Sequence, residues 1–487
     1  MARQIESSRW GTRQVPLQHV GRGNMAPLSY SQQRLWFLDR LEPHNVAYNI
    51  PFRVRLRGGL NKTALRRAVT ELTNRHETLR TRFVERDGVG WQEIGPEGPA
   101  VIEELDIQSS NKKSEQRKLD ELAKRETAAP FDLSVRPLLR LKLAQLSSDE
   151  HVLVGAVHHM ISDGWSTAIF LRELAVLYQA ICKGTPAVLP ALPIQYADYS
   201  IWQKTYLVGE ALELHEAYWK RQLADLSPLE LPADYARKDD LKNSAENLFF
   251  SISPQLSLRV HELSRREGVT MFMLLMAAFQ VLLGWYTKRD DIAVGTDVAN
   301  RNHVETEGLI GFFTNQLVLR VALGGSPAFS EFLQRVRKAT LDAYAHQEMP
   351  FDRLVEILAP ERRSNRNPLV EVKFVYQNVP QYKAEIEGLE IIEEPPLPST
   401  AKFDLLLTLM PEAGALKGDL QYRKELFRQS TMEMLLRRLE QILDVATKNP
   451  DIRLDTLMDR MDTFDQQLLK HTASRTLQQT KRRRIPV

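Results

Sequence analysis

Val157-His158-His159-Met160-Ile161-Ser162-Asp163-Gly164-Trp165 is the stretch around which this chain is organised. The residues before it, 151–157, are rich in valine, leucine and small side chains, which predicts a buried strand. The residues after it, 166–181, predict an amphipathic helix with Ser166 as its N-cap. The two histidines therefore lie where a strand gives way to a loop and then to a helix. Loops that a rigid scaffold holds in this way often carry chemistry.

The two histidines are candidates for catalysis. A neutral histidine, whose ordinary pKa is ~6.5, can take a proton from an amine or hydroxyl nucleophile. Since adjacent residues of a strand point to opposite faces, only one of His158 and His159 is expected to face a site. Asp163 could orient a histidine, as in a catalytic triad, or pair with a distant arginine to hold the loop. Gly164 permits a positive φ or a close backbone approach to a ligand.

Two simpler interpretations of these residues stay open. A pair of histidines at the end of a strand is often a matter of packing alone. Histidine is also a common metal ligand, but the sequence contains no His-Glu-x-x-His motif and no cluster that would supply a third ligand. We therefore predict no metal site. The residues alone indicate a histidine that can act as a base, and nothing more specific.

The composition excludes several classes of protein. A length of 487 residues predicts two to three domains, and 43% hydrophobic with 26% charged residues is typical of a soluble globular chain. The net charge of +3 is too small to indicate a nucleic-acid partner. A single cysteine, Cys182, excludes an intrachain disulfide and a thiolate metal cluster, and suits the reducing cytoplasm. Residues 1–24 carry charges without an apolar core, so they do not form a signal peptide.

One segment imitates a membrane span. Residues 271–286 are almost wholly apolar, but they are shorter than the ~20 residues that a span needs, and they include Gln280. Thr270 is placed to cap this segment as a helix. We predict a buried core helix and no membrane span.

The pattern of helices and strands divides the chain into four parts. Residues 1–24 are polar and rich in turns, and are expected to form a flexible leader. Two mixed α/β regions follow, over 25–185 and 186–460, with prolines punctuating the segment between them. Residues 461–487 form a polar tail that ends in a basic run, which is expected to be solvated.

The central stretch resembles the His-His-x-x-x-Asp-Gly signature of the condensation domains of nonribosomal peptide synthetases. Further segments resemble the other motifs of that family and occur in the family's order. They are Ser29–Leu38, Arg75–Phe83, Tyr196–Trp202, Ile310–Arg320, His346–Asp352 and Arg366–Leu369. The resemblance covers residues 25–457.

The resemblance implies an α/β fold of two chloramphenicol acetyltransferase-like lobes that form a V with a central substrate tunnel. It also implies partners: peptidyl or acyl carrier proteins that deliver thioester substrates from opposite faces on phosphopantetheine arms. The acceptor's amine attacks the donor's thioester carbonyl, and an amide forms. The chain itself is expected to bind no cofactor.

The resemblance also assigns roles to the central stretch. His159 is expected to face the reaction centre, as general base on the amine or as a hydrogen-bonding partner that positions it. Positioning has the stronger case, because an α-amine with a pKa of ~7.7–8.0 is already partly neutral near pH 7. His158 is expected to be structural. The Gly164 N–H is a candidate donor to the developing oxyanion.

Other residues are expected to support the site. In the family, the aspartate of the signature points away from the substrate and pairs with an arginine. The candidate partner of Asp163 is Arg301, with Arg80 as the alternative. Trp202 and Asn315 are expected to be structural residues of their motifs.

Details of the motifs bear on the subtype. The opening motif, 33–38, resembles that of domains that take an L-configured donor and acceptor, and the intact histidine pair excludes a heterocyclisation domain. Epimerisation domains keep the histidines, but their other motifs fit less well. Thr314, Gln316 and Glu348 depart from the usual residues, and the first two put the substrate range in doubt.

Three functions remain to be separated. The first is an amide-forming condensation enzyme, either free-standing or part of a larger assembly, that borrows substrates from partner proteins. The second is an ester-forming acyltransferase that uses an alcohol. The third is a non-catalytic module that only docks carrier proteins, a class that has usually lost the signature present here.

Overall fold

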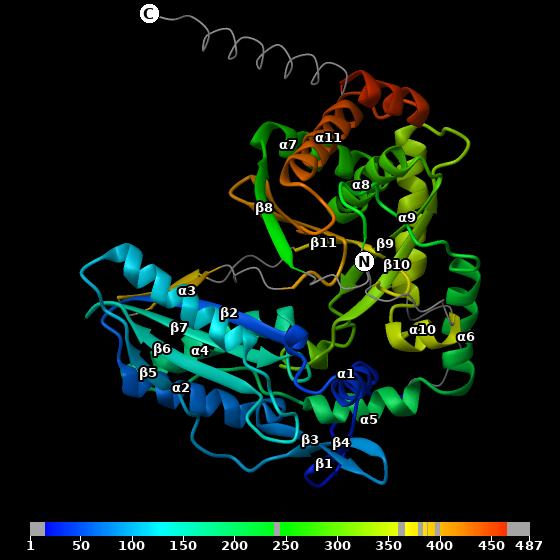
Figure 1. Ribbon diagram of the computed structural model, residues 1–487. Coiled ribbons are helices and arrows are strands. Elements are labelled where there is room, and N and C mark those ends of the chain that lie inside the picture. The colour runs from blue at the N-terminus through cyan, green and yellow to red at the C-terminus, as the bar shows by residue number, and fades with distance from the viewer. Residues whose placement is uncertain are drawn as a thin grey trace, which may run out of the picture.

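The computed structural model describes residues 15–237, 244–358, 366–377, 383–386, 388–394 and 400–464. It contains two mixed α/β lobes, each built on a six-stranded sheet (Figure 1). The predicted α/β class is therefore confirmed.

The first lobe has a sheet of strand order β12-β13-β2-β7-β6-β5. Its strands from the first half of the chain are β2 (Asn49–Gly58), β5 (Glu103–Asp106), β6 (Leu139–Gln145) and β7 (Glu150–His158). A smaller sheet contains β1 (Met25–Pro27), β3 (Thr81–Arg86) and β4 (Val89–Ile94). The helices of this lobe are α1 (Tyr30–Leu41), α2 (Lys62–Arg75), α3 (Lys112–Ala128) and α4 (Gly164–Lys183).

The second lobe has a sheet of strand order β10-β9-β11-β14-β15-β8. Its strands are β8 (Ala245–Ile252), β9 (Asp291–Val298), β10 (Asn315–Ala322), β11 (Val372–Tyr376), β14 (Leu405–Glu412) and β15 (Ala415–Arg423). Its helices are α7 (Pro254–Arg266), α8 (Met271–Thr287), α9 (Phe329–Ala345), α10 (Phe351–Leu358) and α11 (Gln429–Lys448). Two further helices, α5 (Tyr196–Tyr206) and α6 (Gly209–Gln222), follow the first lobe in the chain.

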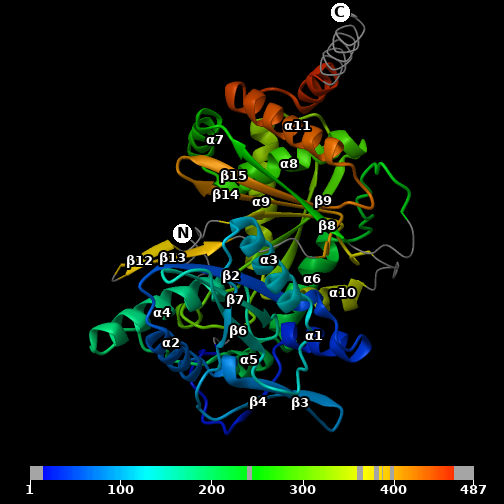
Figure 2. The same ribbon diagram turned by 60° about the vertical axis from the view of Figure 1, so that its left-hand side comes forward.

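Two strands from the second half of the chain belong to the first sheet. They are β12 (Lys383–Ile386) and β13 (Leu389–Glu394), and β13 pairs with β2 in antiparallel register, with Ile391 opposite Leu56. Figure 2 shows them beside β2. The division into 25–185 and 186–460 did not anticipate this exchange, which joins the lobes through a shared sheet.

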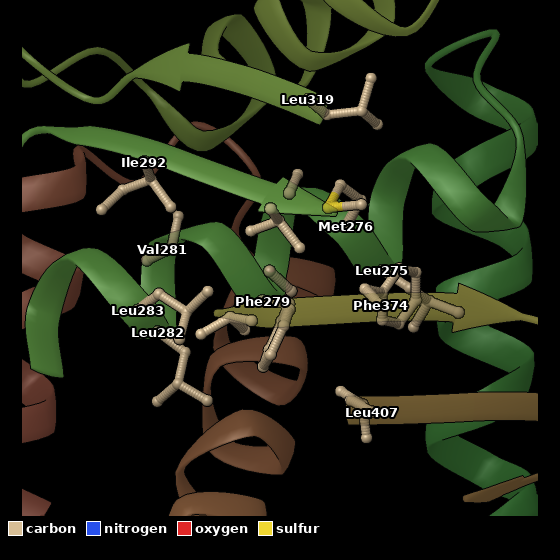
Figure 3. Close-up of a cluster of buried hydrophobic side chains, with 14 of the residues drawn as sticks. Leu275, Met276, Phe279, Val281, Leu282, Leu283, Ile292, Leu319, Phe374 and Leu407 are labelled. Atoms are coloured by element: carbon tan, nitrogen blue, oxygen red, sulfur yellow. The ribbon is translucent and has the colours of Figure 1, made fainter. Parts of the chain in front are cut away.

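The predicted core helix is confirmed as α8. Thr270 caps it by accepting the N–H of Met273 at 3.2 Å, and thirteen of its residues are buried. Its side chains pack against the second sheet, where Phe279 lies near Phe374 of β11 (Figure 3). Burying each large apolar side chain contributes about 1.5–3 kcal/mol. Among the described residues no single helix is long and apolar enough to cross a membrane, and α7 with α8 reaches that composition only as a pair bent by 108°.

The predicted strand before the histidines is confirmed as β7, an inner strand paired with β2 and β6. Its alternating side chains face α3 on one side and α2 with α4 on the other, so it is buried on both faces. Gly155 fits this packing, because a Cβ there would lie 2.4 Å from the Arg140 carbonyl and from the Phe52 ring. The strand therefore forms a continuous apolar run in the sequence.

The start of the following helix corrects the prediction. Asp163, not Ser166, is the N-cap of α4, and its carboxylate accepts the Ser166 N–H at 2.9 Å. The helix therefore begins at Gly164, whose φ is not positive. Ser166 lies one turn inside, where its hydroxyl donates to Asp163 at 2.7 Å. Both residue types favour caps, and the buried carboxylate accepts more donors than a hydroxyl can.

The prediction of a flexible leader is wrong for residues 15–24. The Val15 carbonyl accepts the Trp202 indole N–H at 2.8 Å, and Leu17 is buried in a cluster with Tyr199. Arg22 pairs with the fully buried Asp198 at 3.1 Å. Residues 1–14 and the basic run at 481–484 lie outside the described residues.

Candidate active site

The two histidines point into different surroundings. His158 is buried at the end of β7, and its ring lies edge-on to Phe131 with centroids 5.9 Å apart. Its Nδ1 accepts the Met160 N–H at 3.2 Å. Burial lowers the pKa of His158 to about 3, so the ring is neutral. The His158 side chain therefore has its partners inside the first lobe, and its structural role stays a prediction.

His159 begins the loop and keeps a half-buried side chain. Its backbone N–H donates to the Tyr48 carbonyl at 2.9 Å, and the centroid of its ring lies 4.3 Å from that of the Phe312 ring. Its buried Nδ1 has no hydrogen-bond partner among the described residues. Burial, and next the charge of Lys402, lower the pKa of His159 to about 4. At neutral pH the ring is therefore uncharged and can accept or donate a hydrogen bond.

Asp163 points away from His159 and ties the loop to the second half of the chain. Its Oδ2 accepts the N–H groups of Phe313 and Thr314 at 3.0 and 3.1 Å. Its Oδ1 accepts hydrogen bonds from the backbone N–H and the hydroxyl of Ser166 and from Arg301 Nη2. Burial alone would raise the pKa of this carboxyl, but Arg301 and the hydrogen bonds hold it below its usual value. The geometry contains no Asp163–His159 hydrogen bond, so a triad does not form.

Arg301 is the arginine that forms an ion pair with Asp163. Its Nη2 lies 3.4 Å from Asp163 Oδ1, and its Nη1 donates to the Leu309 carbonyl at 2.7 Å. The alternative is wrong: Arg80 donates to the Gly95 carbonyl and makes no contact with Asp163. Arg301 also lies over the Phe313 ring at 4.1 Å, so it holds the loop of the second half beside the first lobe.

Gly164 is exposed at the first position of α4. Its N–H has no acceptor within the helix, as for the first residue of any helix. A Cβ at this position would meet nothing within 4 Å. Neither backbone conformation nor packing therefore requires glycine here.

The two remaining predicted residues lie in structural contacts. Asn315 Nδ2 donates to the carbonyls of Gln347 and Met349 at 2.8 and 2.7 Å, and its Oδ1 accepts the Phe351 N–H at 3.1 Å. Trp202 stacks on Tyr206 with centroids 4.9 Å apart. Both brace elements around the site without reaching His159.

Sequence reasoning missed three residues beside His159. Tyr48 and Lys402 come from segments with no recognised motif, and only the fold brings them to the histidine. Phe312 lay within a recognised motif, but nothing in the motif indicated that its ring contacts His159. Alternating and periodic patterns report which face of an element is buried, not which distant segment covers it.

The buried neutral histidines predict loss of stability in acid. Burial lowers the pKa values of His158, His159 and His215 to about 3, 4 and 4, so between those values and ~6.5 the unfolded chain binds more protons. The free energy of unfolding should therefore fall as pH drops below ~6.5, by up to about 1.4 kcal/mol per pH unit for each histidine. Urea titrations between pH 7 and 4.5 measure this slope. Replacing the exposed His261 by glutamine should leave it unchanged, and a flat profile contradicts the prediction.

Comparisons with known proteins show which family this chain resembles in sequence and fold. The family model described as the condensation domain matches residues 23–469. A linear gramicidin synthase from Brevibacillus parabrevis is 40% identical over 462 residues, which cover 94% of this chain and 9% of that protein. The chain thus spans less than a tenth of the length of that relative.

Two solved structures are also similar. The X-domain in its complex with OxyB from teicoplanin biosynthesis has a TM-score of 0.81 at 28% identity, covering 92% of this chain and 98% of that one. The SgcC5 protein of Streptomyces globisporus, in complex with a naphthyl ethanediol and sucrose, has a TM-score of 0.72 at 28% identity, covering 88% and 100%.

Proposed function

The chain belongs to the condensation-domain family of nonribosomal peptide synthesis, and from this premise we propose that it catalyses amide formation at His159. The general function of the family is to form peptide bonds. The observation that supports catalysis here is the intact constellation: a neutral, accessible His159 on a loop that Asp163 and Arg301 tie in place.

The proposed reaction joins two thioester substrates that carrier proteins present on phosphopantetheine arms. The acceptor's amine nitrogen attacks the donor's thioester carbonyl, a C–N bond forms, and the C–S bond breaks. The proton lost by the nitrogen ends on the departing thiolate, which leaves as a thiol. Neutral His159 can accept that proton in passing, or hold the amine by a hydrogen bond to its nitrogen.

Gly164 offers a test of the space beside the loop. Since its φ is ordinary and a Cβ would meet nothing, Gly164→Ala should fold normally and gain about 0.4–1 kcal/mol in the free energy of unfolding. If substrate fills that space to reach the exposed N–H, the added methyl should slow turnover about 10- to 100-fold. Unfolding titrations and turnover of the same preparation measure both. Full turnover would exclude a close approach of substrate to this residue.

Reconstitution tests the proposed function. The chain is mixed with a donor carrier protein loaded with an acyl or aminoacyl thioester and with an aminoacyl-N-acetylcysteamine thioester as a soluble acceptor. We expect an amide product by mass spectrometry at a rate at least 100-fold above that of His159→Ala. Each acceptor is also offered as its hydroxy analogue, which forms an ester instead.

Two outcomes would favour other functions. SgcC5 was solved with a diol, so an ester formed faster than the amide would favour an alcohol acceptor for this chain. The X-domain was solved bound to OxyB, so binding of the loaded carrier without any product would favour a docking role. Amide formation that does not depend on His159 would place the chemistry elsewhere.

A further inference from the structure

Lys402 lies near His159 and belongs to none of the motifs recognised in the sequence. It lies just before β14, between the buried Ala401 and Phe403. Its Nζ lies 4.9 Å from the centre of the Tyr48 ring, and the Tyr48 carbonyl accepts the backbone N–H of His159. The side chain is accessible to solvent, yet protein surrounds it closely enough that burial lowers its pKa to about 8.

The charged residues around Lys402 form ion pairs with one another and leave the charge of Lys402 without a counter-ion among the described residues. The neighbouring Lys373 forms an ion pair with Asp297 at 2.6 Å, and Arg34 forms another with Asp352 at 3.0 Å. Lys402 itself has no ion-pair partner among the described residues. Among the described residues, the charged and titratable groups around Lys402 and the two histidines are His158, His159, Asp163, Asp297, Lys373, Arg34, Asp352, Tyr48 and Arg140. Asp163 is paired with Arg301 and Arg140 with Glu126, so within the described part of the chain Lys402 is a positive charge near His159 that no ion pair offsets.

We propose that the unpaired Lys402 is a positioning residue whose charge excludes the ammonium form of the acceptor, so that the amine reaches His159 as the free base. The inference rests on the proposed function and deepens it. A protonated amine has no lone pair and cannot attack a thioester, so the site must receive the neutral form. A fixed positive charge raises the energy of an ammonium nearby and leaves a neutral amine almost unaffected.

The size of the effect follows from Coulomb's law. A unit charge roughly 8 Å away, at an effective dielectric constant of roughly 20 to 40, lowers the pKa of an amine by about one unit. An α-amine with an ordinary pKa of ~7.7–8.0 would then be about half neutral or better at pH 7. His159 is neutral in the same range and would not repel the amine.

The test is the pH dependence of single-turnover rates with saturating acceptor. Lys402→Met keeps the length of the side chain and removes the charge, and Lys402→Arg keeps the charge. With an aminoacyl-N-acetylcysteamine acceptor, Lys402→Met should be about tenfold slower than the wild-type chain at pH 6.5 and within about twofold at pH 9. Lys402→Arg should restore most of the rate at pH 6.5. Thermal unfolding of each variant shows whether the fold is retained.

A second acceptor separates this role from transition-state stabilisation. A hydrazide acceptor is weakly basic and already neutral at pH 6.5, so Lys402→Met should leave its rate unchanged. If Lys402 instead binds the oxyanion, Lys402→Met slows the α-amine and the hydrazide equally at pH 6.5, where Lys402 carries its charge, and the inference is overturned. An unchanged α-amine profile in Lys402→Met also overturns it while the proposed function stands. A wild-type chain with no His159-dependent product refutes the proposed function itself.

Discussion

Replacing His159 by alanine is expected to lower the single-turnover rate of condensation about 10²- to 10⁴-fold and to leave the fold intact. The half-buried ring contacts Phe312, but its buried Nδ1 binds no described residue, so truncation breaks no internal hydrogen bond of that nitrogen. The free energy of unfolding should change by less than about 2 kcal/mol. Rapid-quench kinetics with preloaded carrier, beside urea titrations, measure the two quantities separately.

A glutamine at the same position distinguishes the two roles of His159. Its side chain can hydrogen-bond to an amine but cannot take a proton from it. If positioning dominates, His159→Gln should retain a rate within about tenfold of the wild-type chain, whereas if proton transfer dominates it should match His159→Ala. An alanine variant that keeps more than about a third of the wild-type rate would remove His159 from the mechanism altogether.

Replacing Asp163 by asparagine is expected to remove activity by a different route, through the loss of stability. Asp163 is fully buried, and its carboxylate accepts from Ser166, Phe313, Thr314 and Arg301. An amide presents an NH₂ group to some of these donors and leaves the Arg301 charge without its counter-ion. Breaking a buried ion pair in this way costs about 3–5 kcal/mol. Urea titrations and near-UV circular dichroism measure the loss.

A double-mutant cycle locates the origin of that loss. Arg301→Met alone should also destabilise the chain, and the pair Asp163→Asn with Arg301→Met should lose less than the two single losses added together. Additive losses would mean that the two residues act independently. Activity should not return in the double variant, because the segment at 311–315 still lacks its anchor. An Asp163→Asn chain that folds normally and turns over fully would contradict the role of Asp163 as an anchor.

Two features of the central stretch show which parts of the structure a local sequence pattern can predict. The alternation along β7 predicted that His158 and His159 would be separated, and the ring contacts with Phe131 and Phe312 confirm it. The N-cap of α4 was misassigned to Ser166 because serine and aspartate are both good caps and lie three residues apart. The choice depended on donors from a segment 150 residues away, which no local pattern contains.

Other features depended on segments that the sequence could not bring together. Arg301 and Arg80 were both acceptable partners for Asp163 by charge, and the fold placed only Arg301 within reach across 138 residues. The leader at residues 15–24 was polar enough to suggest a loose segment. It is held instead by the buried Asp198 and the Trp202 indole, whose hydrogen-bonding needs it meets.

By itself the sequence determined the α/β class, the strand, loop and helix of the central stretch, and the separation of its two histidines. These follow from side-chain alternation and helical periodicity, which are set by near neighbours along the chain. Only the tertiary structure decided that β13 pairs with β2, that Arg301 anchors Asp163, and that Lys402 lies beside Tyr48 and His159. Those choices are made by burial, charge pairing and backbone pairing between distant segments, where many partners are compatible with the sequence and one arrangement satisfies them together.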